Sequence, residues 1–120
     1  MARKMDDVRG LEWFEQLPCA ITVCDKNYRI LYMNEMAAEV TAEDGGKALL
    51  GTNLMDCHPP KAQRKLRKVM TSGVPNVYTV EKKGVKKMVY QCHWKKRGHV
   101  GGLLELTFVL PKTIPHHVRA

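Results

Sequence analysis

Two adjacent residues, Cys57 and His58, carry the side chains best suited to chemistry. A thiol beside an imidazole can act as a nucleophile with its base, or can supply two ligands to a metal ion. Pro59 and Pro60 follow and favour extended backbone. Adjacent side chains then point to opposite sides, which argues against direct proton transfer between them. We favour a small buried thiol and a histidine that bonds the backbone at a cavity mouth, with a ligand-contacting His58 as the alternative.

A second dipeptide, Cys92-His93, invites a zinc site of two cysteines and two histidines. In the predicted strand, Cys92 would face the covering helices and His93 the opposite surface, so the four side chains could not converge on one ion. A two-ligand metal site that joins Cys92 to Cys57 or His58 stays open. The four cysteines lack CxxC spacing and a secretory signal, so we expect reduced thiols.

The pair at 57–58 lies just before a predicted amphipathic helix. Its apolar positions share one helical face, Pro60 fits the first turn, and Gly73 is a natural stop. These positions are Ala62, Leu66, Val69 and Met70. Five lysines and arginines fill the remaining surface, so the helix should lay an apolar stripe on the core and show cations to water.

Other elements follow from periodicity and turn chemistry. The pattern predicts a helix over 6–17 and a hairpin of strands over 20–24 and 29–33. Asn34 is a plausible cap for a short helix that begins at Glu35. After Gly73 the pattern alternates, which predicts strands over 77–82, 85–95 and 100–110.

The alternation also sorts side chains between two faces. One predicted set is strongly apolar, and we expect it to face the helices. It comprises Met88, Tyr90, Cys92 and Trp94 in one strand and Leu104, Leu106, Phe108 and Leu110 in the last. Val89, Leu103 and Val109 would then interrupt an outward face that is otherwise polar.

Composition limits the classes of protein. A chain of 120 residues with 44% hydrophobic content makes one ordinary domain. No apolar run is long enough for a membrane span, and the N-terminus turns acidic where a signal peptide would become apolar, so we expect a cytoplasmic protein.

The net charge of +8 is unevenly distributed. Residues 1–56 carry six Lys/Arg against ten Asp/Glu, or −4, whereas residues 57–120 carry fourteen against two, or +12. The lysines at 82–87 and the cations at 95–97 flank opposite ends of one strand and lack interleaved aromatic residues. We therefore interpret them as a solvated surface, or as attraction to the acidic half of a neighbouring copy, rather than as a nucleic-acid site.

The order of elements, with several local motifs, resembles a PAS domain. The motifs are Asp25, the run 29–34 with Met36-Ala37-Ala38 after it, Gly51, and the glycine-rich entry 98–102 to the last strand. The run Cys57-His58-Pro59-Pro60 is similar to a signature of one bacterial branch of that family. The chain departs from the common pattern by ending its last strand with Glu105-Leu106-Thr107-Phe108 rather than Asp-Ile-Thr.

The resemblance implies an α+β fold, with a five-stranded antiparallel sheet of order 2-1-5-4-3 covered on one face by helices. It divides the chain into a flanking helix at 1–17, a PAS domain at 18–110 and a tail at 111–120. It also implies a sensory, non-enzymatic module that binds a small molecule between helices and sheet and relays occupancy to a copy of itself or to a signalling partner. The predicted ligand-binding residues are Tyr32, Met36, Met55, His58, Leu66, Met70, Tyr90, Cys92 and Leu104.

Three further expectations accompany this reading. The first alternative function is a pure dimerisation module with a filled core. The second is a haem-based gas or redox sensor in which His58 is the axial ligand and Met55 or Met70 the second one. We also expect a homodimer built through the outer sheet face and the N-terminal helix, whose apolar residues are Val8, Leu11, Trp13, Phe14 and Leu17.

Overall fold

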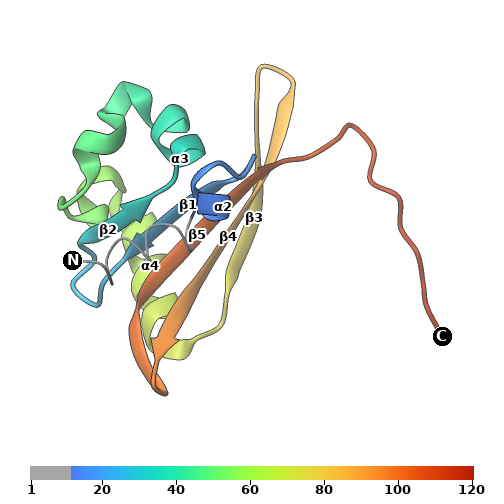
Figure 1. Ribbon diagram of the computed structural model, residues 1–120. Coiled ribbons are helices and arrows are strands. Elements are labelled where there is room, and N and C mark those ends of the chain that lie inside the picture. Colours follow the sequence, from blue (N-terminus) through green and yellow to red (C-terminus); the bar gives the residue numbers. More distant parts are fainter. Residues whose placement is uncertain (1–11) are drawn as a thin grey trace.

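The computed structural model describes residues 12–120, and its centre is one antiparallel sheet (Figure 1). The strands lie in the order β2-β1-β5-β4-β3, as the sequence predicts. Their bounds are β1 Ala20–Cys24, β2 Ile30–Met33, β3 Asn76–Lys82, β4 Val85–Lys96 and β5 His99–Val109. The predicted strand boundaries are confirmed to within one residue.

The helices are short, apart from one. They are α2 Glu12–Glu15, α3 Glu35–Val40, the 3-10 turns η1 Ala42–Asp44, η2 Gly46–Leu49 and η3 Leu54–Cys57, and α4 Pro60–Ser72. Of the helix predicted over 6–17, only its later part lies among the described residues, and Val8 and Leu11 lie outside them.

Helix α4 begins and ends as its sequence requires. Pro60 occupies the first turn, where its missing N–H costs nothing. Gly73 takes the left-handed conformation with φ of 75° and donates its N–H to the carbonyl of Val69. A Cβ at this position would lie 2.6 Å from the His93 ring, so glycine is needed for space as well as for its backbone angle.

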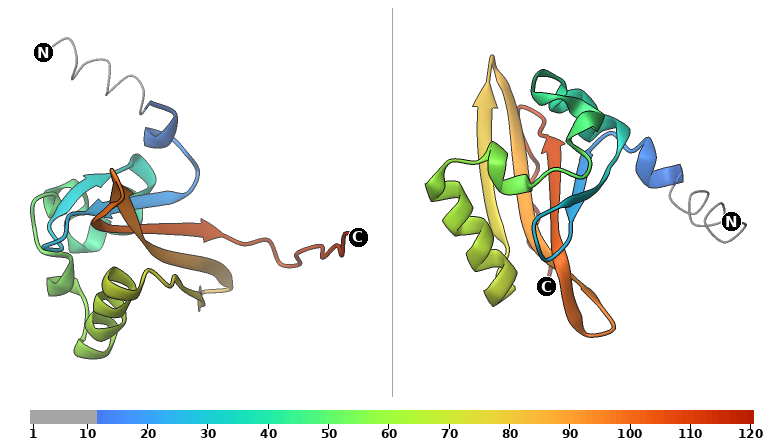
Figure 2. Two further views of the ribbon diagram at one scale, coloured as in Figure 1. Left: turned by 90° about the horizontal axis from the view of Figure 1, so that it is seen from below. Right: turned by 90° about the vertical axis from the view of Figure 1, so that its left-hand side faces the viewer.

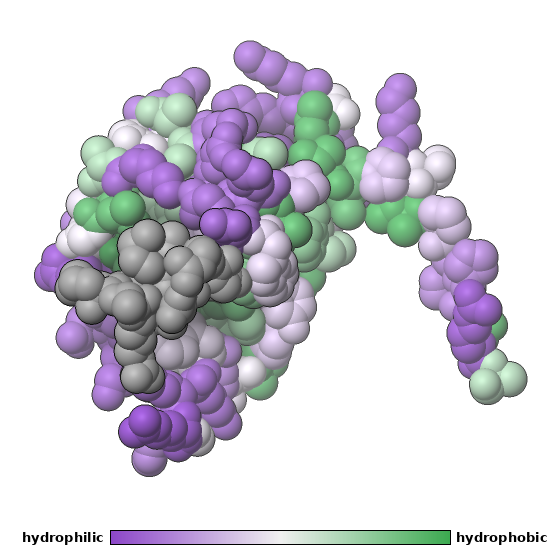
Figure 3. All heavy atoms as spheres, viewed as in Figure 1, coloured by the Kyte–Doolittle hydropathy of each residue, from purple (hydrophilic) through white to green (hydrophobic). Residues whose placement is uncertain are grey.

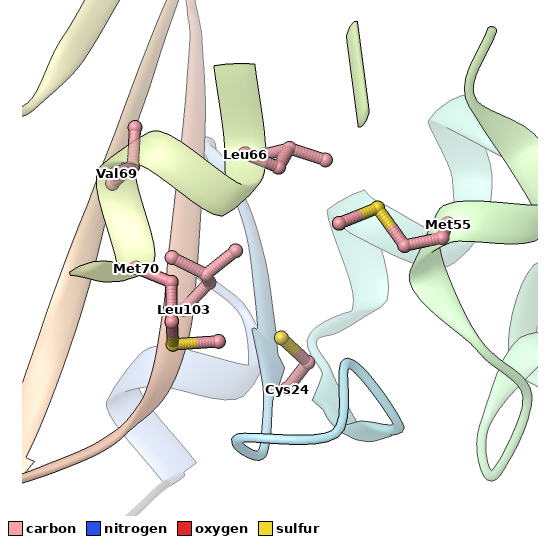
Figure 4. Close-up of a cluster of buried hydrophobic side chains, with 6 residues drawn as sticks. All are labelled: Cys24, Met55, Leu66, Val69, Met70 and Leu103. Atoms are coloured by element: carbon pink, nitrogen blue, oxygen red, sulfur yellow. The ribbon is translucent and has the colours of Figure 1, made fainter. Parts of the chain in front are cut away.

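The sheet separates two layers. Helix α4 packs on one side, whereas α2 lies on the other, and the view from below shows the sheet between them (Figure 2). We call the α4 side the inner face and the α2 side the outer face. On the inner face, side chains from α4, η3, β1 and β5 meet in the main core cluster (Figure 4). Its members are Cys24, Met55, Leu66, Val69, Met70 and Leu103.

Asn34 joins the second part of the core to the N-terminal segment. Its side-chain oxygen accepts hydrogen bonds from the N–H groups of Ile21 and Ala37, at 3.0 and 2.9 Å. Its amide nitrogen donates to the carbonyls of Phe14 and Cys19, at 2.9 and 2.8 Å. The residue is fully buried, and all its hydrogen-bonding capacity is used. One side chain therefore caps α3, as predicted, and also fixes the connection from α2 to β1.

The assignment of the two sheet faces from sequence is wrong. Leu103 is 2% exposed and packs in the core cluster with α4, and its cross-strand partner is His93. His93 Nδ1 lies 3.3 Å from the carbonyl oxygen of Met70 in α4. Alternation then puts Cys92 and Leu104 on the outer face. The apolar set expected to meet the covering helices lies on the face opposite α4.

The physical reason lies in what covers each face. Period-2 alternation shows which residues share a face, but it does not show which face the helices cover. Helix α4 supplies much of the apolar surface of this core. The inner sheet face can therefore carry the polar Gln91 beside the apolar Val89 and Leu103.

Candidate functional site

An open groove lies between the first half of α4 and strands β3 and β4. Its volume is about 510 Å³, within the range of about 300–1,000 Å³ usual for small-molecule pockets. It is lined by His58, Pro59, Lys61, Ala62, Lys65, Asn76, Tyr78 and Gln91. By contrast, the void enclosed between Leu66, Leu103 and their neighbours measures only about 10 Å³. The interior under α4 is filled, and the usable space is the groove beside it.

The η3 turn positions His58 at the groove. Asn53 begins the turn by accepting a hydrogen bond from the N–H of Met55 at 2.8 Å. The His58 Nδ1 atom lies 2.8 Å from the Leu54 carbonyl oxygen, which requires that Nδ1 carry the proton. Gln63 of α4 donates to the carbonyls of Met55 and His58, at 3.0 and 2.9 Å. These bonds hold the connector and the start of α4 together, so one wall of the groove is rigid.

A polar row crosses the inner face beneath α4. Cross-strand pairing aligns Thr22 with Glu105, Glu105 with Gln91, and Gln91 with Asn76. The amide nitrogen of Asn76 donates to Gln91 Oε1 at 2.8 Å, and Gln91 Nε2 donates to Glu105 Oε2 at 2.8 Å. Gln91 is 4% exposed. Because buried polar groups are costly unless they are paired, this chain of bonds fixes the direction of each amide.

Burial also affects the ionisable groups nearby. The pKa of the Tyr78 hydroxyl is raised, chiefly by burial and secondly by the negative charge of Glu105. Burial raises the pKa of the Cys24 thiol to about 11, and it raises that of Cys92. Both thiols are therefore protonated at neutral pH and are poor nucleophiles.

Five of the nine predicted ligand-binding residues lie at the groove or in the core. His58 lines the groove. Met55, Leu66 and Met70 belong to the main core cluster, and none of them lines the groove. Met36 packs against the second core cluster of Ala20, Ile30, Met33 and Ala37.

The other four predicted residues lie on the outer face. Cross-strand pairs join Tyr90 to Leu106 and Cys92 to Leu104, and Val23 pairs with both Leu104 and Tyr32. The Tyr32 hydroxyl donates to Glu15 of α2 at 2.8 Å, and burial with this bond raises its pKa. Tyr32, Tyr90 and Cys92 line neither the groove nor the small void under α4, so the prediction that they lie between helices and sheet is wrong, whereas Leu104 borders that void.

The positions of the cysteines, His58 and the two methionines bear on the predicted thiol, metal and haem chemistry. The four cysteines are free thiols. Cys57 is exposed, so the prediction that its thiol is buried is wrong. Among residues 12–120, no three Cys, His, Asp or Glu side chains are grouped to hold a metal. Met55 and Met70 are buried with Leu103, away from the groove that His58 lines. These residues do not fit a haem held between His58 and either methionine.

Sequence reasoning missed most of the groove. The predicted helix shows its cations, which include Lys61 and Lys65, to water, and alternation with Cys92 puts Gln91 on the predicted outward face. The available signal was three polar residues, Asn76, Gln91 and Glu105, at positions that antiparallel pairing brings side by side.

Comparison with known proteins identifies the family. A family model described as PAS fold matches residues 14–87, more than half of the chain. Among the curated proteins, none matches this chain. The chain belongs to the PAS family, whose domains are generally sensory or regulatory modules.

Solved structures agree on the fold. The PAS domain of Bordetella pertussis BvgS is 18% identical, with a TM-score of 0.65, over 92% of this chain and 88% of that one. A sensory box sensor histidine kinase from Vibrio cholerae is 16% identical, with a TM-score of 0.62, over 92% and 98%. A Vibrio cholerae VqmA–ligand–DNA complex is 18% identical, with a TM-score of 0.64, over 86% of this chain and 51% of that one.

Among the residues that the structure describes, no helix is long and apolar enough to cross a membrane.

Proposed function

We propose that this chain is a sensory module that binds a small molecule in the groove and passes its occupancy through the sheet to a second copy of the chain. The observation that carries the proposal is the two-sided character of β4. Its inner side contributes Gln91 to the groove, and its outer side contributes Tyr90 to an apolar surface. A ligand and a partner would thus contact the same strand from opposite sides.

The outer apolar surface supports the second half of the proposal. Cross-strand pairs build it from β1, β5, β4 and β3, and Figure 3, which views this side, shows hydrophobic side chains over the central strands. Its members are Ile21, Val23, Val77, Met88, Tyr90, Cys92, Leu104, Leu106 and Phe108. Most are partly exposed, and Val77 is 47% exposed. A contiguous apolar patch of this kind marks an interaction site.

A second copy is the occupant that the chain favours. Helix α2 lies on the outer side of the sheet, and its Trp13 is 60% exposed, which adds exposed apolar area to that helix. A two-fold interface places the same patch on both partners, which suits a self-complementary apolar surface. The charge difference between the two halves of the chain, −4 against +12, would add orientation.

The neighbours support a sensory role by analogy. One is a sensor histidine kinase, and another was solved with a ligand and DNA. The alternative, a dimerisation module without a ligand, is favoured by the filled interior, whose enclosed void is about 10 Å³. The two functions differ in whether the groove is used.

Amide NMR shifts of the full-length chain test the groove directly. We expect members of a library of small acids, amines and neutral compounds to shift the amides of Asn76, Tyr78 and Gln91. Ala62→Trp should abolish these shifts because the indole would fill the groove, whereas Ala42→Trp, at an exposed position outside it, should not. A library without a binder, or shifts that survive Ala62→Trp, would favour the pure dimerisation module.

A further inference from the structure

We propose that the groove selects small organic anions: a carboxylate or phosphate at Lys61 and Lys65, a planar apolar body, and an amide or hydroxyl edge on Asn76. The inference rests on the proposed function and specifies the class of ligand. It is carried by the charges, the hydrogen bonds and the walls of the groove.

Charge is the first step. Lys61 and Lys65 are four residues apart on α4, so they lie one turn apart on the same side of the helix, and both line the groove. The groove lining contains no acidic side chain. In the described part of the chain, neither lysine has a carboxylate oxygen within 4.0 Å. The two ammonium groups are therefore free to pair with an anion from solution.

The nearest acidic group of the polar row does not oppose this charge. Glu105 lies two strands from Asn76, with Gln91 between them, and its carboxylate accepts the Gln91 amide N–H. It contributes to the small enclosed void rather than to the groove. An anion at the lysines would thus be separated from Glu105 by the Gln91 side chain.

Hydrogen bonding is the second step. Because Gln91 Oε1 accepts one N–H of Asn76, the Asn76 amide is turned in a known direction. Among the described residues, the Asn76 side chain forms this one hydrogen bond. Its carbonyl oxygen and its second N–H are therefore left for a ligand. An amide edge offers a donor and an acceptor together, so a ligand amide or hydroxyl would complete the row.

Shape is the third step. Pro59, Ala62 and Tyr78 add apolar surface to the lining that Lys61, Lys65 and the two amides share. A volume of about 510 Å³ accommodates a single-ring compound with a short polar arm. The three features together describe an aromatic acid with a hydrogen-bonding group along its length.

The probe is hippurate, which joins a phenyl ring, an amide and a carboxylate. Its neutral counterpart is N-benzoylglycinamide, and phenyl phosphate and benzylamine test the other charges. Binding to the full-length chain is measured by amide NMR shifts at low salt. We expect hippurate or phenyl phosphate to bind, and the tighter of the two shows whether the groove prefers a carboxylate or a phosphate. Benzylamine and the neutral amide should bind several-fold more weakly.

Variants make the charge requirement specific. Lys61→Gln with Lys65→Gln should weaken binding of the anion roughly two- to thirtyfold, the range expected for the loss of two exposed ion pairs. Lys68→Gln removes one charge from the same helix outside the groove and should have little effect. Salt should weaken binding to the parent chain more than to the double variant.

The outcomes distinguish the preference for anions from small-molecule binding in the groove as such. Neutral or cationic probes that bind as well as hippurate, or a double variant that binds the anion normally, would overturn the inference while leaving a small-molecule groove. If no probe of any charge shifts the groove amides, both the inference and the proposed groove function fail.

Discussion

The two faces of the sheet differ in what they leave for a partner. The inner face meets α4 in a filled core, yet a polar row of side chains crosses it and reaches an open groove. The outer face has few polar side chains, and most of its apolar residues are partly exposed. The inner face therefore has the chemistry to recognise a small polar molecule, whereas the outer face has the chemistry to bind another protein surface.

The largest expected difference between the faces is in folding stability. Leu66→Ala on the inner side should lower the free energy of unfolding by about 2–5 kcal/mol, because Leu66 is 2% exposed and its removal leaves a cavity. Val77→Ala on the outer side, at 47% exposure, should cost well under 1 kcal/mol in the monomer. Urea unfolding of both variants checks this, and equal losses would show that the outer face is as much core as the inner one.

Substitutions in the polar row should lower the free energy of unfolding by less, because they remove hydrogen bonds rather than apolar packing. Gln91→Leu keeps the side-chain size but removes the partners of Asn76 and Glu105, so it should cost about 1–3 kcal/mol. Replacing Asn76 and Glu105 by apolar residues as well should recover part of that loss. The triple variant should fold but no longer bind in the groove. If Gln91→Leu alone leaves stability unchanged, the row is not a buried network.

Thiol reactivity distinguishes the faces without a change in stability. Native alkylation at pH 8 should modify the exposed Cys57 first and Cys24 last, since Cys24 is 1% exposed and its pKa is raised to about 11. Cys92, on the outer face and partly exposed, should react at an intermediate rate, unless a partner covers it. Mass spectrometry over time gives the order, and early modification of Cys24 would contradict the packing under α4.

The same raised pKa predicts a pH dependence. A thiol whose pKa is raised by folding stabilises the native state only while it is protonated. Its contribution is full below the pKa of the unfolded thiol and is lost as the pH rises through about 11. Cys24→Ala should therefore reduce the loss of stability above pH 9, as measured by urea unfolding at fixed pH values. An unchanged slope would mean that Cys24 titrates normally.

Much of the fold could be predicted from the sequence because its local signals agree. Pro60 and Gly73 bound α4, Asn34 caps α3, and the turns at Lys83-Gly84 and Arg97-Gly98 adopt the positive φ angles that hairpins favour. The order of elements then identified the sheet topology. These features depend on residues near one another in the chain.

The candidate site could be predicted only in part, because it depends on which face is covered. The two prolines after His58 predict a stiff connector with this residue at a cavity mouth, and His58 does line the groove. Gln91 and Asn76 were missed because polar residues in strands usually face water, and nothing in their spacing shows that α4 covers them. The outer apolar set is predicted on the helix-covered face for the same reason: its members share a face, but their spacing does not show which face α4 covers.

Sedimentation equilibrium of the full-length chain tests most directly whether the two faces have separate tasks. The account predicts a mass near twice 13.7 kDa at micromolar concentration. Leu106→Glu, on the outer face, should shift it to the monomer, whereas Lys65→Gln, in the groove, should leave the dimer intact. Amide spectra of both variants should confirm that they fold. A monomeric parent chain, or a dimer that survives Leu106→Glu and dissociates in Lys65→Gln, would contradict the account.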